Sequence, residues 1–81
     1  MKIRVKFFAI LRERAGCSAV TKDLADGSTV ADLWRDLQKD YPKLDVPGIR
    51  MLYAVNQNYV GVDQQLKDQD EVVFIPPVSG G

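Results

Sequence analysis

The sequence contains no histidine, and this absence excludes several kinds of site. Catalytic pairs of histidine with serine or cysteine need the imidazole as a base, and many zinc sites use it as a ligand. Cys17 is the only cysteine, so neither an internal disulfide nor a cysteine-rich zinc site can form. A lone cysteine is typical of a small apolar core residue, and the natural compartment for this composition is the reducing cytoplasm.

The chain also lacks an excess of charge of either sign. Its 11 Lys and Arg residues balance its 11 Asp and Glu residues, which gives a formal net charge of zero. This balance removes the main electrostatic attraction to nucleic acids and anionic membranes. No apolar run is long enough to span a bilayer, and the N-terminus is typical of a charged strand and not of a signal peptide. We therefore expect neither a nucleic-acid partner nor a membrane partner.

What the 81 residues do contain is the pattern of one small domain. Apolar and charged residues alternate from Lys2 to Phe7, which predicts a half-buried strand. Phe8 breaks this alternation, because it is an apolar residue at a position on the charged face. A short helical turn over residues 9–15 is predicted to close at Gly16, and residues 18–24 are predicted to return as an antiparallel strand.

The main helix has clear start and stop signals. Thr29 is a good N-cap with Asp32 at the capping-box position, and apolar residues recur at helical spacing until Pro42 ends the helix. The remaining predicted elements are a turn at Pro47-Gly48, strands over residues 51–56, 59–60 and 71–75, and a loop anchored by Leu66.

This order of elements predicts an α+β fold, in which a mixed sheet of about five strands wraps across one main helix, the β-grasp or ubiquitin-like arrangement. The first strand is expected inside the sheet with the last strand parallel to it. Side-chain parity directs Val72 and Phe74 to the helix and leaves Phe8, Val73 and Ile75 on the uncovered face, where Tyr59 joins them from the edge. Clustered exposed apolar residues of this kind indicate a docking surface.

Residues 76–81 are predicted to form a tail beyond a domain of residues 1–75. Two prolines stiffen the start of this tail, and two glycines at its end lack a Cβ and can enter a narrow slot. The only reactive group there is the α-carboxylate of Gly81. The alternative to a functional tail is a chain end that frays without a role.

Four segments together resemble the small subunits of molybdopterin synthase, the MoaD-type sulfur carriers. These segments are Val5 to Gly16 with its Phe-Phe-Ala and Arg-Glu elements, Ala54-Val55-Asn56-Gln57, Asp70 to Phe74, and the terminal Pro-Pro-Val-Ser-Gly-Gly. The likeness covers the whole chain, including its length. One departure concerns Gln69, which stands where the family often has glycine, so we expect positive φ at this residue.

The resemblance implies chemistry on the Gly81 carboxylate. In such carriers an E1-like adenylyltransferase uses ATP to adenylate the carboxylate, and a sulfur donor then converts it to a thiocarboxylate. The carrier delivers this sulfur to cyclic pyranopterin monophosphate in the active site of a large subunit, within a heterotetramer of two small and two large subunits, and two transfers form the molybdopterin dithiolene. The chain would itself be a non-catalytic subunit that binds no cofactor or metal.

The resemblance also assigns roles to individual residues. The residues that would thread into the large subunit are Pro76, Pro77, Val78, Ser79 and Gly80, and those that would contact partners are Phe8, Tyr59 and Ile75. Three other functions remain open. The chain could carry sulfur for thiazole synthesis or transfer-RNA thiolation, modify lysines as a ubiquitin-like protein does, or act as an inert β-grasp module whose tail is dispensable.

Overall fold

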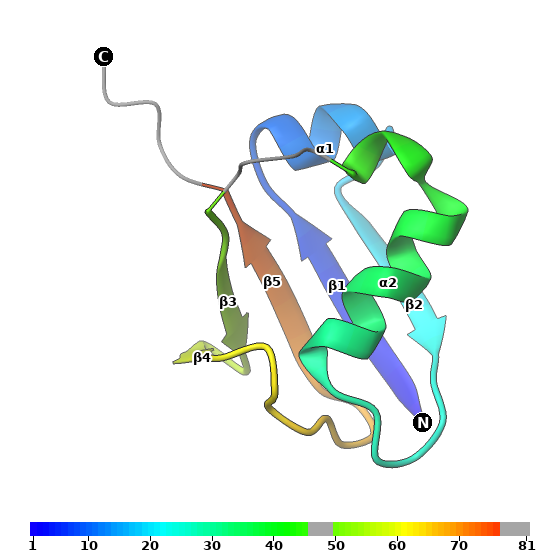
Figure 1. Ribbon diagram of the computed structural model, residues 1–81, viewed down its shortest axis with the longest axis vertical. Coiled ribbons are helices and arrows are strands. Elements are labelled where there is room, and N and C mark those ends of the chain that lie inside the picture. Colours follow the sequence, from blue (N-terminus) through cyan, green and yellow to red (C-terminus); the bar gives the residue numbers. More distant parts are fainter. Residues whose placement is uncertain (46–49, 77–81) are drawn as a thin grey trace.

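The computed structural model describes residues 1–45 and 50–76, and these residues form a five-stranded mixed sheet with one main helix (Figure 1). The α+β prediction is therefore confirmed. The elements in chain order are β1 (Lys2–Phe7), α1 (Ile10–Ala15), β2 (Ala19–Asp23), α2 (Val30–Asp40), the 3₁₀ turn η1 (Pro42–Leu44), β3 (Leu52–Val55), β4 (Asn58–Val60) and β5 (Glu71–Ile75). The turn predicted at Pro47-Gly48 lies outside the described residues.

The strands lie in the order β2-β1-β5-β3-β4. β1 and β5 are parallel, whereas β1–β2, β5–β3 and β3–β4 are antiparallel pairs. The register aligns Phe7 with Phe74 across the parallel pair. The first strand thus lies inside the sheet beside the last one, and β4 forms an edge, as the sequence predicted.

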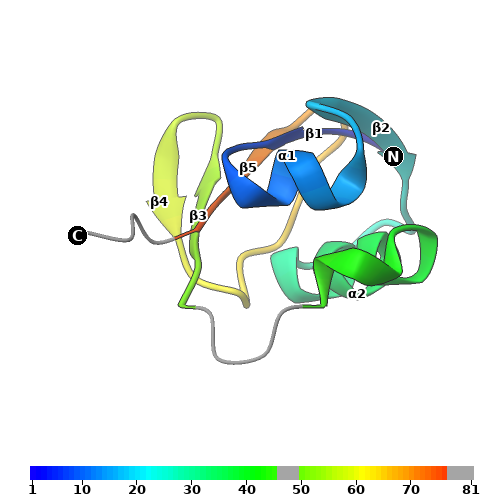
Figure 2. The ribbon, with the colours of Figure 1, turned by 90° about the horizontal axis from the view of Figure 1, so that it is seen from above.

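The core lies between the sheet and α2, because both present one apolar face. The alternation in β1 buries Ile3, Val5 and Phe7 completely or almost so. Figure 2 shows α2 on one side of the sheet, and no helix of the described chain covers the opposite side. The Trp34 ring of α2 packs at 4.8 Å, centroid to centroid, on Phe74 of β5. The helix is thus fixed to the strand that leads towards the C-terminus.

Local hydrogen bonds set the ends of both helices. The Thr29 side chain accepts a hydrogen bond from the Asp32 N–H, and the Asp32 carboxylate accepts one from the Thr29 N–H, so the predicted capping box is present. Such a cap stabilises a helix by about 1 kcal/mol. Gly16 closes α1 with φ of 77°, as expected, and its N–H donates to the Arg12 carbonyl.

A polar network joins the β3–β4 turn to the start of β5. The buried Asp70 carboxylate accepts hydrogen bonds from the Asn56 side-chain amide and the Lys67 N–H, both at 2.8 Å. The Asn56 side-chain carbonyl accepts in turn from the Glu71 N–H at 3.0 Å. Gln69, beside this network, has φ of 72°, which confirms the expected positive φ. Two of the sequence segments that carried the resemblance therefore have structural roles.

Candidate functional site

The candidate site lies at the end of the sheet where β5 finishes. β5 has a neighbouring strand on each side, β1 and β3, and it ends at Ile75, which pairs with Leu52 of β3. The described chain ends one residue later at Pro76, whose side chain is buried. The first residue of the predicted tail therefore packs against the domain. The other predicted tail residues, Pro77 to Gly81, lie outside the described residues, so the reactive carboxylate remains a sequence prediction.

Apolar side chains gather on the uncovered face of the sheet around this point. We define the apolar patch by five residues: Phe8, Leu52, Tyr59, Val73 and Ile75. The exposed fractions are 48% for Phe8, 57% for Leu52 and 73% for Tyr59, and Val73 and Ile75 are half-buried. Large apolar side chains this exposed gain little from folding, so their clustering indicates a surface that another molecule covers.

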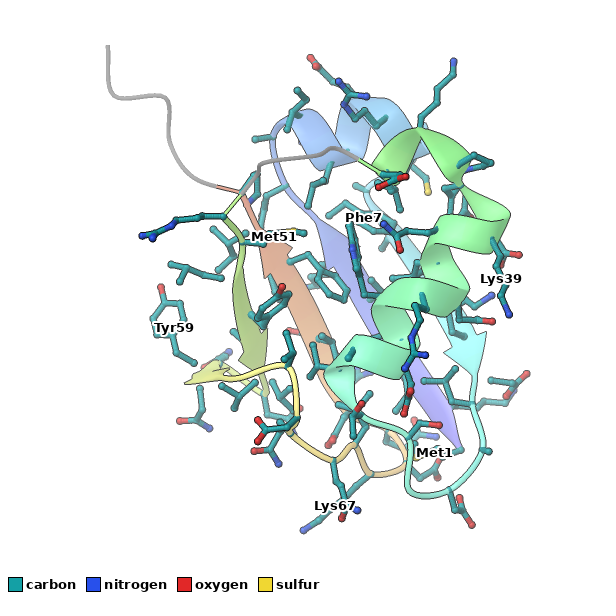
Figure 3. All side chains as sticks on the ribbon, viewed as in Figure 1. Met1, Phe7, Lys39, Met51, Tyr59 and Lys67 are labelled. Carbon is teal, nitrogen blue, oxygen red and sulfur yellow. The ribbon has the colours of Figure 1, made fainter. Side chains whose placement is uncertain are left out.

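The strand register explains how the patch is assembled. Ala54 pairs with both Val73 and Tyr59, which places those two side chains on one face of the sheet with Ala54 between them. Phe8 and Ile75 directly follow the paired residues Phe7 and Phe74 in two adjacent strands. In Figure 3 Tyr59 lies at the outer edge of the molecule, beside β3 and β4. The patch therefore draws on four strands or strand ends: β1, β5, β3 and β4.

The predicted positions of the partner-binding residues agree with this geometry. Phe8 and Tyr59 are exposed, and Ile75 lies on the opposite face from the fully buried Phe74. The parity argument is therefore correct for both β1 and β5. No observation on the chain itself tests the partner contact, which stays a prediction.

Sequence reasoning missed Leu52, the second most exposed residue of the patch. The run from Met51 to Val55 is apolar throughout, so no alternation shows which of its side chains face outward. Only the pairing of Leu52 with Ile75 assigns it to the patch. Such a cross-strand pair could have been inferred once the antiparallel register of the two strands was assumed.

Charged residues border the patch along β1. The Lys6 ammonium lies 3.4 Å from the Glu71 carboxylate, and the Arg4 guanidinium donates to the Gln69 carbonyl at 3.1 Å. With Val5, Ala19, Val20 and Thr21, these side chains of β1 and β5 line a shallow open groove. The ion pair is partly exposed, so it contributes little to stability. The uncovered face is thus apolar where β5 ends and charged where β5 begins.

The pKa shifts in the domain belong to structural contacts. The pKa of Asp32 is lowered chiefly by the Thr29 N–H and that of Asp68 chiefly by the Lys2 N–H, because both hydrogen bonds favour the carboxylate. Hydrogen bonds to Asp36 and Asp40 raise the pKa of Lys22, and burial raises that of Tyr41. None of these four groups is a patch residue.

The described residues hold no cluster of three or more His, Cys, Asp or Glu side chains that could bind a metal ion. Within residues 1–45 and 50–76, no helix has the length and apolarity needed to cross a membrane. What the described site offers is a surface for a partner and a firmly held strand pointing towards the predicted tail.

Comparisons with known proteins agree on one family. The ThiS family matches residues 5–81. The molybdopterin synthase sulfur carrier subunit of Escherichia coli is 44% identical over 98% of this chain and 99% of its own length. That of Chlamydomonas reinhardtii is 42% identical over the whole of both chains. Among solved structures, SAMP1 of Haloferax volcanii superposes with a TM-score of 0.90 at 27% identity, covering the whole of both chains.

Proposed function

Because this chain belongs to the ThiS family, we propose that it is the sulfur carrier subunit of a molybdopterin synthase. The observation that carries the proposal is its 42% and 44% identity, over nearly the whole chain, to curated subunits of that name. The described surface supports it, since the apolar patch includes Ile75, the last residue of the strand from which the predicted tail continues. A carrier needs both a docking face and a reactive end at a fixed distance from it.

The proposed chemistry takes place on the Gly81 carboxylate. A carboxylate is a poor electrophile, so an E1-like partner first joins it to the α-phosphate of ATP, and pyrophosphate leaves. A sulfur donor then attacks the acyl carbon of this mixed anhydride and AMP leaves. With a persulfide donor this attack gives an acyl disulfide. A thiol then attacks the donor's own sulfur, which forms a disulfide and releases the transferred sulfur on the carrier as a thiocarboxylate. ATP is consumed by the partner, and this chain binds no cofactor.

Delivery uses the patch and the tail together. The large subunit docks on Phe8, Tyr59 and Ile75, and the tail from Pro76 to Gly80 leads Gly81 into its active site. There the thiocarboxylate passes its sulfur to cyclic pyranopterin monophosphate, and two such deliveries form the dithiolene. A thiocarboxylate is anionic and nucleophilic at neutral pH, so the absence of histidine from the sequence presents no obstacle.

The tail residues suit passage through a narrow channel. Prolines limit the conformations of the unbound tail, so less entropy is lost when it is threaded. The glycines have no Cβ, so they fit where any other residue would clash. The proposed complex holds two small and two large subunits and works in the cytoplasm.

The test is a two-stage assay on the full chain. The protein is mixed with the E1-like enzyme, ATP and a sulfur donor, and its intact mass is measured. We expect the replacement of one oxygen by one sulfur, and loss of that sulfur when the large subunit and pterin precursor are added, with molybdopterin as product. A chain that never gains sulfur under these conditions would contradict the proposal.

A second candidate function is protein modification. It is favoured by the TM-score of 0.90 to SAMP1, because the protein of that name from the same organism is a small archaeal modifier protein. In this case the activated Gly81 carboxylate would form an isopeptide bond with a lysine of another protein. Adducts that resist reducing agent and contain the Gly81–lysine linkage by mass spectrometry would support it. Sulfur discharge that requires the pterin precursor would support the carrier instead.

A further inference from the structure

A strained backbone residue, Ala9, directly follows Phe8 of the apolar patch. This residue has φ of 52° and ψ of −127°. The Phe8 carbonyl accepts a hydrogen bond from the Leu11 N–H at 3.1 Å, which closes a four-residue turn with Ala9 at its first central position. The dihedral angles are close to the φ of about +60° and ψ of about −120° of a type II′ turn, the mirror image of type II. Glycine is the residue expected at this position.

The sequence nevertheless has alanine there. A residue with a Cβ rarely adopts this conformation, and it persists only where the surrounding structure imposes it. The constraint is visible on both sides of the turn. Phe7 before it is buried and packs edge-on against Tyr41 at 6.2 Å, and Leu11 after it is completely buried. The Ala9 carbonyl accepts from the Arg12 N–H at 3.1 Å, which begins α1.

Between these two buried anchors the turn presents apolar side chains to solvent. Phe8 is 48% exposed and Ile10 is 39% exposed. Because Phe7 and Leu11 are both held in the core, the direction of the Phe8 side chain depends on the backbone angles of the turn between them, including those of Ala9. With alanine at position 9 few alternative turns are accessible, whereas glycine would open several more. The methyl group of Ala9 thus narrows the range of directions that Phe8 can take.

We propose that Ala9 is a positioning residue, whose strained turn holds Phe8 in the direction needed for docking to the large subunit. The inference rests on the proposed function, because the docking partner is the one named there. According to this proposal, the strain at Ala9 lowers the free energy of unfolding but raises the affinity for the large subunit, because Phe8 is already ordered before the large subunit binds. Ordering a side chain or loop on binding is a cost that such pre-organisation removes.

The test compares Ala9→Gly with the parent chain in two measurements. Glycine relieves the strain, so we expect a melting temperature a few degrees higher. Glycine also frees the turn, so we expect the Kd for the purified large subunit of the same organism's molybdopterin synthase to rise about three- to tenfold. A purely structural role would raise the melting temperature and leave the Kd unchanged.

The chain offers a matched control at the opposite end of β1. Gln69 also has positive φ, at 72°, and its N–H donates to the carbonyl of Lys2, the first residue of β1. Gln69→Gly therefore places glycine at another position of positive φ, far from Phe8. It should leave the melting temperature unchanged or slightly higher, and the Kd should stay within about twofold of the parent. An equal loss of affinity in both variants would overturn the proposal.

A third chain separates conformation from contact. D-alanine keeps a methyl group at position 9 but favours positive φ. The full chain can be assembled by joining a synthetic thioester of residues 1–16 to a fragment that begins at Cys17. We expect a higher melting temperature with the parent Kd. If D-alanine weakens binding as much as glycine does, the original methyl contacts the partner and the positioning role is wrong.

Phe8→Asp distinguishes failure of this inference from failure of the proposed function. If Phe8→Asp weakens binding strongly while Ala9→Gly binds like the parent, only the positioning role of Ala9 is wrong. If Phe8→Asp also binds like the parent, Phe8 does not dock the large subunit, and both proposals for this face are overturned.

Discussion

The two ends of the β1–β5 pair are built from opposite kinds of residue. We call the end with Asn56, Lys67 and Asp70 the polar end, and the end with Phe8 and Ile75 the tail end. At the polar end a buried carboxylate has its hydrogen bonds made within the domain. At the tail end apolar side chains are exposed. The polar groups of the polar end are paired within the domain, whereas the tail end leaves apolar side chains exposed, which under the proposed function a partner would cover.

The difference shows that a distinctive motif and a functional surface need not coincide. The Val-Asn-Gln and Asp-Glu segments belong to the polar end, where Asn56 bonds both the Asp70 side chain and the Glu71 backbone. Leaving the buried Asp70 carboxylate unpaired would cost about 1–3 kcal/mol, which is sufficient reason for the residues that donate to it. The residues proposed to dock are ones that break a pattern, as Phe8 breaks the alternation of β1.

The largest expected effect lies beyond the tail end, at Gly81. Deleting Gly81 leaves a terminal carboxylate but draws it back by about 3.5 Å. Because misplacing a reacting group by about 1 Å can cost about 100-fold in rate, we expect at least that loss in molybdopterin formation. The melting temperature should not change, since Gly81 follows the last residue of β5, Ile75, by six positions in the sequence. The two-stage assay with intact mass measures both steps, and a parent-like rate would favour the inert module with a dispensable tail.

Phe8→Asp should disrupt docking while the fold survives. A carboxylate in the covered centre of an interface is expected to weaken binding by about 2–4 kcal/mol. Circular dichroism should show a parent-like fold, because Phe8 is half-exposed. Val62→Asp is the matched control, since Val62 is 46% exposed but lies outside the patch, and it should bind like the parent. Unfolding of Phe8→Asp would mean that Phe8 belongs to the core.

Asp70→Ala should reverse this pattern at the polar end. It leaves the Asn56 amide and the Lys67 N–H without their acceptor, so we expect the free energy of unfolding to fall by about 2–3 kcal/mol. Urea titration measures this loss. The free energy of unfolding should fall less in Asp70→Asn, because one acceptor oxygen remains. Binding to the large subunit, measured well below the melting temperature, should be unchanged. Weaker binding by the folded variant would show that the two ends are coupled.

Gln69→Gly should have the smallest effect and the opposite sign. Replacing a residue held at positive φ by glycine relieves strain, although glycine also gains entropy in the unfolded chain. We therefore expect a free energy of unfolding that is unchanged or higher by at most about 1 kcal/mol. A clear decrease in urea titration would mean that the Gln69 side chain contributes more to the polar end than its conformation costs.

Much of the fold could be predicted because its signals are local. The alternation in β1 fixed the buried faces, and Thr29 with Asp32 marked the start of α2. Ala9 could not be predicted in the same way. Alanine favours helix, and its positive φ is imposed by the buried anchors on either side of the turn. The Asp70 network joins segments 14 residues apart and likewise depends on tertiary structure.

The site was predictable in part for the same physical reason. Parity along β1 and β5 placed Phe8 and Ile75 on the uncovered face, because the side-chain period of a strand is two. Leu52 escaped detection because its neighbours in the chain are all apolar. The reactive role of the Gly81 carboxylate was predicted from the terminal glycines and from the family resemblance, and neither argument depends on the described geometry.

The central position of β5 has a consequence for the newly made chain. The strand order β2-β1-β5-β3-β4 leaves two separate hairpins, β1–β2 and β3–β4, until β5 is inserted between them. β5 is the last strand to leave the ribosome, so the sheet cannot close during synthesis of the earlier segments. Phe8 and Leu52, which belong to different hairpins, are brought onto one surface only by that closure. A chain that ends before β5 therefore cannot form the apolar patch, and under the proposed function it would not compete with complete carriers for the large subunit.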